Sequence, residues 1–221
     1  MQFLFCEKGG DDSILLKGEI YNYLFKVRRQ RSEKPIYIRD PKSPKILHRY
    51  KIDSIDRRKA QLELQESLED FVDPDKKISL GWCVVDSKTI EKTLPMINEL
   101  GVYEIYFIYC EYSQKDIKLD FERWNKIIQN SSMQSGRYNM TNLYIIDSLE
   151  RYFEKFPETI SIDFSENRLD KIDKKEVSIL VGAEGGFSQK EREKFKTVKG
   201  LNSPYILKSQ TAVISAINLV F

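Results

Sequence analysis

The sequence predicts an α/β protein in two parts, a small β-barrel followed by an α/β domain built on a parallel sheet. Over residues 3–68, short β-type segments follow one another with a single helix among them, a pattern typical of small barrels. From residue 78 onward, strands alternate with helices at the lengths expected of a parallel sheet covered by helices. Two domains of different fold class are therefore expected.

The N-terminal domain is predicted from β-branched and aromatic runs that are separated by turns. A helix is expected over Glu19–Arg28, because Ile20, Tyr23, Leu24 and Val27 fall on one helical face. The expected strands of this domain are Phe3–Cys6, Ser13–Leu16, Pro35–Arg39, Lys45–Ile55 and Ala60–Glu66.

A polar stretch that contains Pro74, residues 70–77, is the expected linker. We therefore expect one domain over residues 1–69 and a second over residues 78–221. The strands expected in the second domain are Ile78–Val85, Tyr103–Cys110, Asn142–Ile146, Thr159–Phe164 and Val177–Val181. Its expected helices are Lys88–Leu100, Phe121–Gln134, Leu149–Phe156, Ser188–Lys196 and Thr211–Val220.

The bulk composition is that of a globular protein. Hydrophobic residues make up 41% and charged residues 32% of the 221 positions, which excludes the disordered and fibrous classes. No apolar run approaches the roughly 20 residues that cross a bilayer, and the start lacks the basic region of a signal peptide. We therefore expect a cytoplasmic protein with no membrane contact.

Metal and disulfide chemistry are not expected. Cys6, Cys83 and Cys110 are odd in number, widely spaced and free of a C-x-x-C pair, which argues against a disulfide framework and a zinc site. Their apolar neighbours favour small buried side chains. His48 is the single histidine, so sites made from several histidines are excluded.

Basic residues are concentrated near the N-terminus. Residues 1–60 carry 15 Lys/Arg against 8 Asp/Glu, whereas the remainder carries 21 against 26. This asymmetry favours a polyanion-binding module, although a solvated basic face remains open. The expected phosphate-binding residues are Lys26, Arg28, Arg29, Arg31, Lys45 and Arg49, with Lys42 and Lys51 in the same stretch. Tyrosines lie among them, either as stacking platforms for bases or as barrel core.

The most informative segment is Val177–Glu191, in which a buried strand runs into a glycine-rich turn and then into a helix. Ser188 and Glu191 have the spacing of a capping box. In open α/β sheets, ligands bind beyond the carboxyl ends of the strands, where such loops gather. The spacing is neither that of a phosphate loop nor that of a dinucleotide fold, and a turn with a purely structural role remains an alternative.

A second segment, Pro204–Ala212, reads as a three-residue strand and a polar turn that leads into the last helix. The two strand–loop–helix units are expected to face one pocket. A third segment, Gln134–Arg137, ends a helix at Gly136 and leaves Arg137 just beyond it, as a surface cation or a functional one.

These segments, in this order, resemble the SPOUT superfamily of RNA methyltransferases, and more narrowly its RsmE-type branch, which makes 3-methyluridine in small-subunit ribosomal RNA. The family's Gly-Pro-Glu-Gly-Gly turn is matched by Gly182–Gly186, and its Leu-Arg-x-Glu-Thr-Ala turn by Leu207–Ala212. Its Gln-Ser-Gly-Arg is matched by Gln134–Arg137, and an earlier Glu-Leu-Gly-Val by Glu99–Val102. The likeness covers nearly the whole chain.

The chain also departs from the family pattern. Ala183 replaces a proline, Lys208 an arginine and Gln210 a glutamate, and the proline usual after the Gln-Ser-Gly-Arg motif is missing at Asn139-Met140. Lys208 keeps the positive charge but loses the bidentate fork of arginine. A divergent member is indicated.

The resemblance implies S-adenosylmethionine as cofactor, a deep trefoil knot in the α/β domain, a PUA-like barrel that contacts RNA, and a homodimer. The partner would be small-subunit (16S) ribosomal RNA or the assembled small subunit, and no metal is implied. The expected cofactor-binding residues are Val181, Gly182, Glu184, Gly185, Gly186, Ile206, Leu207, Lys208, Thr211 and Ala212.

Two residues are expected to act on the methyl acceptor, a uridine that must lose its N3 proton. Arg137 would stabilise negative charge on the uracil oxygens, and Glu184 would orient a loop or accept the proton. Two alternatives stay open. The first is a related methyltransferase that acts on another RNA position. The second is a non-catalytic RNA-binding or ribosome-assembly factor with the same fold.

Overall fold

The computed structural model describes residues 2–31, 33–114 and 116–221, which form two compact units. The first unit comprises Met1–Asp73 together with Ser132–Asn139, and the second comprises Pro74–Ser131 and Met140–Phe221. No helix in the described part of the chain is long and apolar enough to cross a bilayer.

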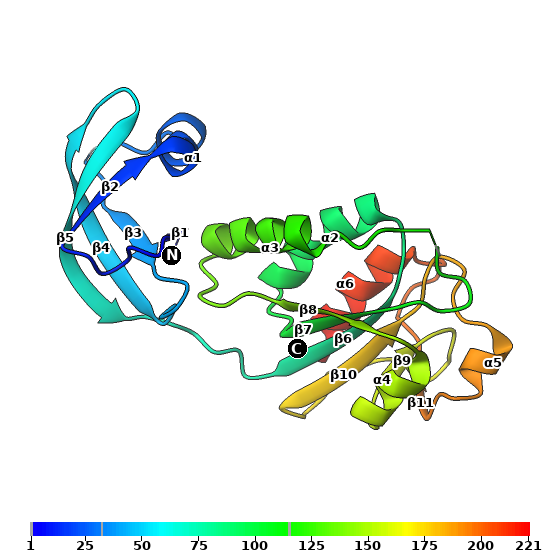
Figure 1. The fold of residues 1–221 in the computed structure, drawn as a ribbon. Coiled ribbons are helices and arrows are strands. Elements are labelled where there is room, and N and C mark those ends of the chain that lie inside the picture. Colours follow the sequence, from blue (N-terminus) through cyan, green and yellow to red (C-terminus); the bar gives the residue numbers. More distant parts are fainter. Residues whose placement is uncertain (1, 32, 115) are drawn as a thin grey trace. The chain divides into compact units, whose positions relative to one another are not determined.

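The first unit is built on a curved five-stranded sheet (Figure 1). Its strands are β1 (Leu4–Phe5), β2 (Ser13–Lys17), β3 (Ile36–Arg39), β4 (Ile46–Ile55) and β5 (Lys59–Glu69), in the order β1-β3-β4-β5-β2. All neighbours are antiparallel except β1 and β3. Two irregularities between β4 and β5, at Arg49/Tyr50 and Ile52/Ser54, add local twist, which explains how two long strands curl around a small core.

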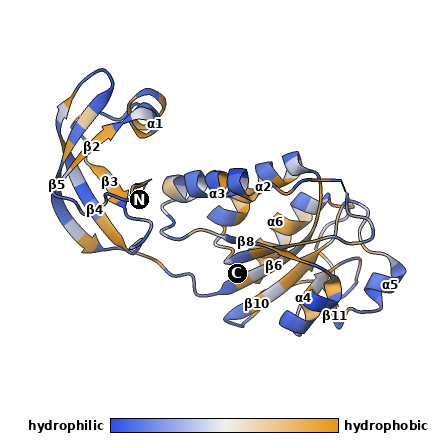
Figure 2. Cartoon of the chain, in the orientation of Figure 1, coloured by the Kyte–Doolittle hydropathy of each residue, from blue (hydrophilic) through white to orange (hydrophobic). Residues whose placement is uncertain are grey.

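The helix expected over Glu19–Arg28 is present in two pieces. The short helix α1 (Gly18–Tyr21) continues into η1 (Asn22–Val27), which has π-helical hydrogen bonding. Tyr21 and Leu24 point inward, and apolar side chains of the strands complete the core. In Figure 2, hydrophobic and hydrophilic residues alternate along these strands, as expected for a sheet with one buried face.

The second unit has a six-stranded, wholly parallel sheet in the order β11-β9-β10-β6-β7-β8. Its strands are β6 (Lys77–Cys83), β7 (Glu104–Ile108), β8 (Asn142–Ile146), β9 (Ile160–Ile162), β10 (Glu176–Val181) and β11 (Thr197–Lys199). Its helices are α2 (Ser87–Glu99), α3 (Phe121–Ser135), α4 (Leu149–Lys155), α5 (Gln189–Arg192) and α6 (Ser209–Val220), the last turn of α3 being assigned to the first unit. The expected α/β class is confirmed.

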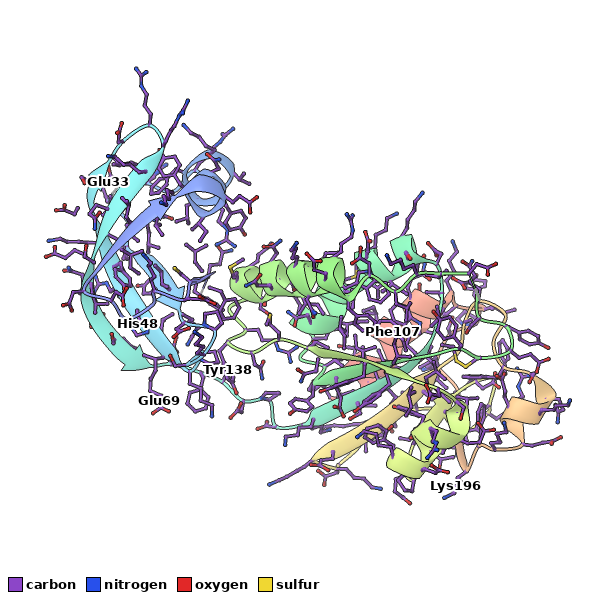
Figure 3. The ribbon with its side chains drawn as sticks, in the orientation of Figure 1. Glu33, His48, Glu69, Phe107, Tyr138 and Lys196 are labelled. Carbon is purple, nitrogen blue, oxygen red and sulfur yellow. A yellow bond between two sulfur atoms is a disulfide. The ribbon has the colours of Figure 1, made fainter. Side chains whose placement is uncertain are left out.

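Helices cover both faces of this sheet. On one face, Phe107 of β7, which is labelled in Figure 3, packs against Phe121 and Trp124 of α3. On the same face, Trp82 of β6 reaches the first residue of α6. On the other face, α4 packs its Tyr152 against the sheet, and a Cβ on Gly81 would come within 2.7 Å of its ring. Glycine is therefore required at position 81.

Cys83 and Cys110 form a disulfide, which corrects the expectation that no cysteine is paired. Because β6 and β7 are parallel neighbours with Cys83 opposite Ile108, both cysteines lie near the carboxyl ends of adjacent strands. Their Cα atoms are 5.7 Å apart, within the usual range for a disulfide. Both are buried as expected, and Cys6 is free.

Three further differences concern the C-terminal third. The helix expected over Ser188–Lys196 is a single turn, because after Arg192 the backbone tightens into i→i+3 hydrogen bonds. Strand β11 was not expected, since three half-buried residues give no clear pattern. The three-residue strand expected at the start of the segment Pro204–Ala212 is absent: Tyr205 and Ile206 are exposed, and Pro204 has no N–H to pair.

Candidate functional site

A cavity of about 740 Å³ lies beyond the carboxyl ends of β9 and β10. Its lining begins at the last residue of each strand, Ile162 and Val181, and continues through the loops that follow them. A third loop, immediately before α6, closes the lining. This is the place where parallel α/β sheets bind ligands.

The glycine-rich turn after β10 is closed on itself. Gly186 donates its N–H to the carbonyl of Ala183 at 2.9 Å. Gly186 has a φ of +69°, a left-handed conformation that glycine adopts at little cost. A Cβ on Gly182 would come within 3.2 Å of the Gly186 backbone. The conformation of the turn thus favours glycine at position 186, and a Cβ at position 182 would force a neighbouring group to shift.

The turn is also anchored from outside. Ser188 and Glu191 form the expected capping box, in which each side chain accepts a hydrogen bond from the backbone N–H of the other residue. The second carboxylate oxygen of Glu191 accepts the N–H of Glu111 at 2.8 Å. Since Tyr112 follows Glu111 and packs against Gly185, this buried carboxylate holds the loop after β7 against the glycine-rich turn.

The third loop reaches the first through one serine. Ser209, the first residue of α6, is buried and donates its hydroxyl to the carbonyl of Gly182 at 2.5 Å. The hydroxyl oxygen of Ser209 also accepts the indole N–H of Trp82 at 2.9 Å. The start of α6, the glycine-rich turn and β6 are therefore joined at a single hydroxyl.

Most residues that the sequence analysis assigned to cofactor binding gather around this cavity. Those in the lining are Val181, Gly182, Glu184, Gly185, Gly186, Ile206, Leu207 and Ala212. Lys208 and Thr211 are not among the lining residues. Lys208 is the exposed N-cap of α6, and Thr211 is exposed in its first turn.

The cavity has lining residues that the sequence analysis missed. Asp163 directly follows β9, and its carboxylate is bound by the guanidinium of Arg192 at 2.6 and 3.3 Å. Phe164 and Tyr205 also line the cavity, with 75% and 82% of their surfaces exposed. Both Asp163 and Phe164 were expected inside a strand over Thr159–Phe164, whereas β9 ends at Ile162.

Arg137 and Glu184 belong to different units, the first and the second respectively. As expected, the helix before Arg137 stops at Gly136, which has a φ of +85°. Arg137 donates its Nε to the Oδ1 of Asn139 at 2.7 Å, and Asn139 is part of the departure from the family pattern. Burial lowers the pKa of Arg137 to about 10, so its guanidinium still carries its charge at neutral pH.

The basic residues of the first unit fall into two groups. In the described part of the chain, no ion pair involves Lys26, Arg28, Arg29 or Arg31, which lie at the end of η1 and just after it. By contrast, Lys45 pairs with Asp73 and Arg49 with Glu66, at 3.8 and 3.1 Å. Carboxylates thus offset part of the charge expected on β4.

The tyrosines among these cations have different environments. Tyr21 and Tyr50 are core residues whose hydroxyls bond the carbonyls of Asp56 and Asp11. Tyr23 is half-buried and lies under the guanidinium of Arg28, 4.6 Å from the ring centre. The barrel-core alternative therefore holds for Tyr21 and Tyr50.

His48 is buried on β4, where its Nδ1 lies 2.8 Å from the hydroxyl of Ser67 (Figure 3). Burial lowers its pKa, and this exceeds the opposing effect of Asp40. Among the described residues, no group of three or more His, Cys, Asp or Glu side chains is arranged to hold a metal ion.

Comparison with known proteins gives consistent similarities. A family model described as an RNA methyltransferase domain matches residues 73–221. The ribosomal RNA small subunit methyltransferase E of Helicobacter pylori is 30% identical over 219 residues, covering 97% of this chain and 96% of that protein. The protein of the same name from Aquifex aeolicus is 33% identical over 228 residues, with coverages of 97% and 96%.

A solved structure is similar in fold. The ribosomal RNA small subunit methyltransferase E of Neisseria gonorrhoeae, crystallised with S-adenosyl methionine, matches with a TM-score of 0.78 at 22% identity. The match covers 99% of this chain and 95% of that one. Both units of the chain thus have counterparts in one known architecture.

Proposed function

The chain belongs to the family of the small-subunit ribosomal RNA methyltransferases E, and from this premise we propose that it transfers a methyl group from S-adenosylmethionine to N3 of a uridine in small-subunit (16S) ribosomal RNA. The observation that carries the proposal is the meeting of two loops, 182–186 and 204–207, around one cavity at the carboxyl ends of the strands.

The cavity fits the proposed donor. Its volume of about 740 Å³ lies within the range of roughly 300–1,000 Å³ that is usual for small-molecule sites. Ile162, Leu201 and Leu207 offer apolar surface for an adenine ring, and the Asp163 carboxylate, whose oxygens also bind Arg192, would use its remaining lone pairs to accept a hydroxyl or ammonium group. Val181, the glycines and Ala212 would complete the binding surface.

The reaction is an in-line displacement. When bound, S-adenosylmethionine supplies a methyl group on a positively charged sulfur, and the bond to that sulfur breaks as the bond to N3 forms. The N3 proton must leave the base. The contribution of the protein is to hold the acceptor at near-attack distance, an effect worth up to about 7–11 kcal/mol.

Arg137 and Glu184 are proposed to act on the acceptor. A guanidinium stabilises the negative charge that the uracil oxygens acquire as N3 loses its proton. Arg137 is suited to this task because it stays charged at neutral pH. Glu184 is exposed on the glycine-rich turn, where it would orient the loop or accept the proton.

RNA binding is proposed for the first unit, as a PUA-like module. Lys26, Arg28, Arg29 and Arg31 would contact phosphates, because carboxylates do not already neutralise them. Lys45 and Arg49 would contribute less, since binding RNA would compete with Asp73 and Glu66. We further propose a trefoil knot, a homodimer and a cytoplasmic location, as the family likeness implies.

The proposal is tested by methyl transfer. Purified small ribosomal subunits from a strain that lacks the protein, and their protein-free RNA, are incubated with the chain and methyl-labelled S-adenosylmethionine. Nucleosides are then identified by mass spectrometry. We expect label in 3-methyluridine, and comparison of the two substrates shows which one is used. Label in another nucleoside would contradict the proposed position, and no transfer to either substrate would contradict the activity.

A further inference from the structure

We propose that Ser209 is a positioning residue of the donor pocket, whose hydroxyl holds the glycine-rich turn and the start of α6 in the arrangement that binds S-adenosylmethionine. This inference rests on the proposed function. Neither the sequence motifs nor the family likeness assigns a role to Ser209.

The geometry uses both hydrogen-bonding capacities of the hydroxyl. Ser209 Oγ accepts the indole N–H of Trp82 at 2.9 Å, so its own proton is free to be donated elsewhere. That proton goes to the carbonyl oxygen of Gly182, 2.5 Å away. The hydrogen bond from the Trp82 indole thereby fixes the direction in which the Ser209 hydroxyl points its proton.

All three partners are shielded from water. Trp82 is fully buried, Ser209 is 4% exposed, and Gly182 is buried. Water therefore does not replace a lost partner easily, and removal of the hydroxyl would leave an indole N–H and a carbonyl unsatisfied. The structure would relieve this cost by moving the turn away from α6.

The contact joins loops that are distant in sequence but line one cavity. Gly182 and Ser209 are both lining residues, and they belong to the segments that begin after β10 and before α6. In the described part of the chain, no other hydrogen bond joins residues 182–187 to residues 205–212. Ser209 thus sets the spacing between the two sides of the pocket.

The chain offers a matched control in Ser161. This serine is fully buried on β9, the strand next to β10, and its hydroxyl has no hydrogen-bond partner among the described residues. Ser161→Ala therefore removes a buried hydroxyl from the sheet that contains β10, without breaking a hydrogen bond. Ser209→Thr keeps the hydroxyl, and Trp82→Phe removes the indole N–H together with part of the buried ring.

The experiment measures, on full-length protein, the Kd for S-adenosylmethionine by calorimetry, the kinetic constants of RNA methylation, and the thermal midpoint. We expect Ser209→Ala to weaken donor binding by about tenfold or more. Its KM for the donor should rise by the same factor, while kcat at saturating donor stays near the wild-type value. Ser161→Ala should bind as wild type, Ser209→Thr should restore most of the affinity, and Trp82→Phe should lose part of it.

Equal donor affinity in Ser209→Ala and the wild type would overturn the inference and leave the proposed function intact. A loss of kcat without a change in KM would also overturn it. If the wild-type chain itself binds no S-adenosylmethionine, the proposed function fails and this inference fails with it. Should Ser209→Ala not fold, Trp82→Phe decides, and wild-type affinity in that variant would overturn the inference.

Discussion

Tyr112 packs so closely against Gly185 that a Cβ on Gly185 would come within 2.9 Å of the Tyr112 Cβ. Gly185→Ala must therefore displace either Tyr112 or the glycine-rich turn. The Glu191 carboxylate resists both movements, because it accepts the N–H groups of Glu111, next to Tyr112, and of Ser188, just after the turn. We expect the variant to bind S-adenosylmethionine about tenfold more weakly, since overpacking costs about 1–3 kcal/mol. Calorimetric titration measures this.

The double variant Tyr112→Gly/Gly185→Ala is the control, because glycine at position 112 removes the Cβ that the added methyl group would meet. If the clash is the cause, the double variant binds the donor more tightly than Gly185→Ala alone, and a double-mutant cycle gives the coupling. Strictly additive effects of the two substitutions would show that the contact with Tyr112 does not position the turn.

Replacement of Arg137 should separate chemistry from donor binding. If the guanidinium stabilises charge on the uracil oxygens, Arg137→Ala lowers kcat by about 10²–10³-fold, as loss of a charge-stabilising donor does elsewhere. The Kd for S-adenosylmethionine should not change. Arg137→Lys keeps the charge but not the planar fork, so it should recover only part of the rate. Full activity in Arg137→Ala would refute the role.

The cations around η1 should carry the salt dependence of RNA binding. Each phosphate contact removed lowers the slope of log affinity against log salt by about 1. A variant with Lys26, Arg28 and Arg31 changed to Ala is therefore expected to bind RNA more weakly and with a shallower slope. The variant with Lys45, Arg49 and Lys51 changed to Ala is the matched control, because these three cations already pair with Asp73, Glu66 and Glu63. An equal loss in the control would contradict the division into two groups.

His48 should make the stability of the first unit depend on pH. Burial lowers its pKa in the folded chain below the ordinary value of 6.5. Above pH 6.5 the ring is neutral in both states, and the fold has its full stability. As the pH falls from 6.5 through the folded pKa, the unfolded chain binds a proton first, so the free energy of unfolding decreases.

Urea unfolding at several pH values between about 5 and 8 measures the free energy of unfolding over the range in which His48 is expected to affect it. His48→Gln, which has no titrating ring, should flatten the profile over that window. A profile that is equally steep with and without the ring would assign the pH dependence to other groups.

Elements with local patterns could be predicted from the sequence. The α/β class, the alternation after residue 78 and the capping box at Ser188 and Glu191 depend on periodicity and short-range spacing, and all are present. The disulfide between Cys83 and Cys110 could not be predicted, because it depends on which strands become neighbours in the sheet. The same holds for β11, a short edge strand.

In the candidate site, too, only the features with a local pattern could be predicted. The rule that ligands bind at the carboxyl ends of strands placed the glycine-rich turn and the last loop together. Asp163 and Ser209 were missed because their importance depends on contacts with Arg192 and with Gly182 and Trp82, which are distant in sequence. Such contacts carry no local signal.

The central claim is that two loops, 182–186 and 204–207, enclose the methyl donor. A crystal structure of the chain grown with S-adenosylmethionine tests this claim directly. We predict that the donor lies in the cavity beyond β9 and β10, bordered by Gly182 and Leu207, with the Ser209–Gly182 hydrogen bond intact. A donor bound elsewhere on the chain, or these loops empty at saturating donor, would contradict the account.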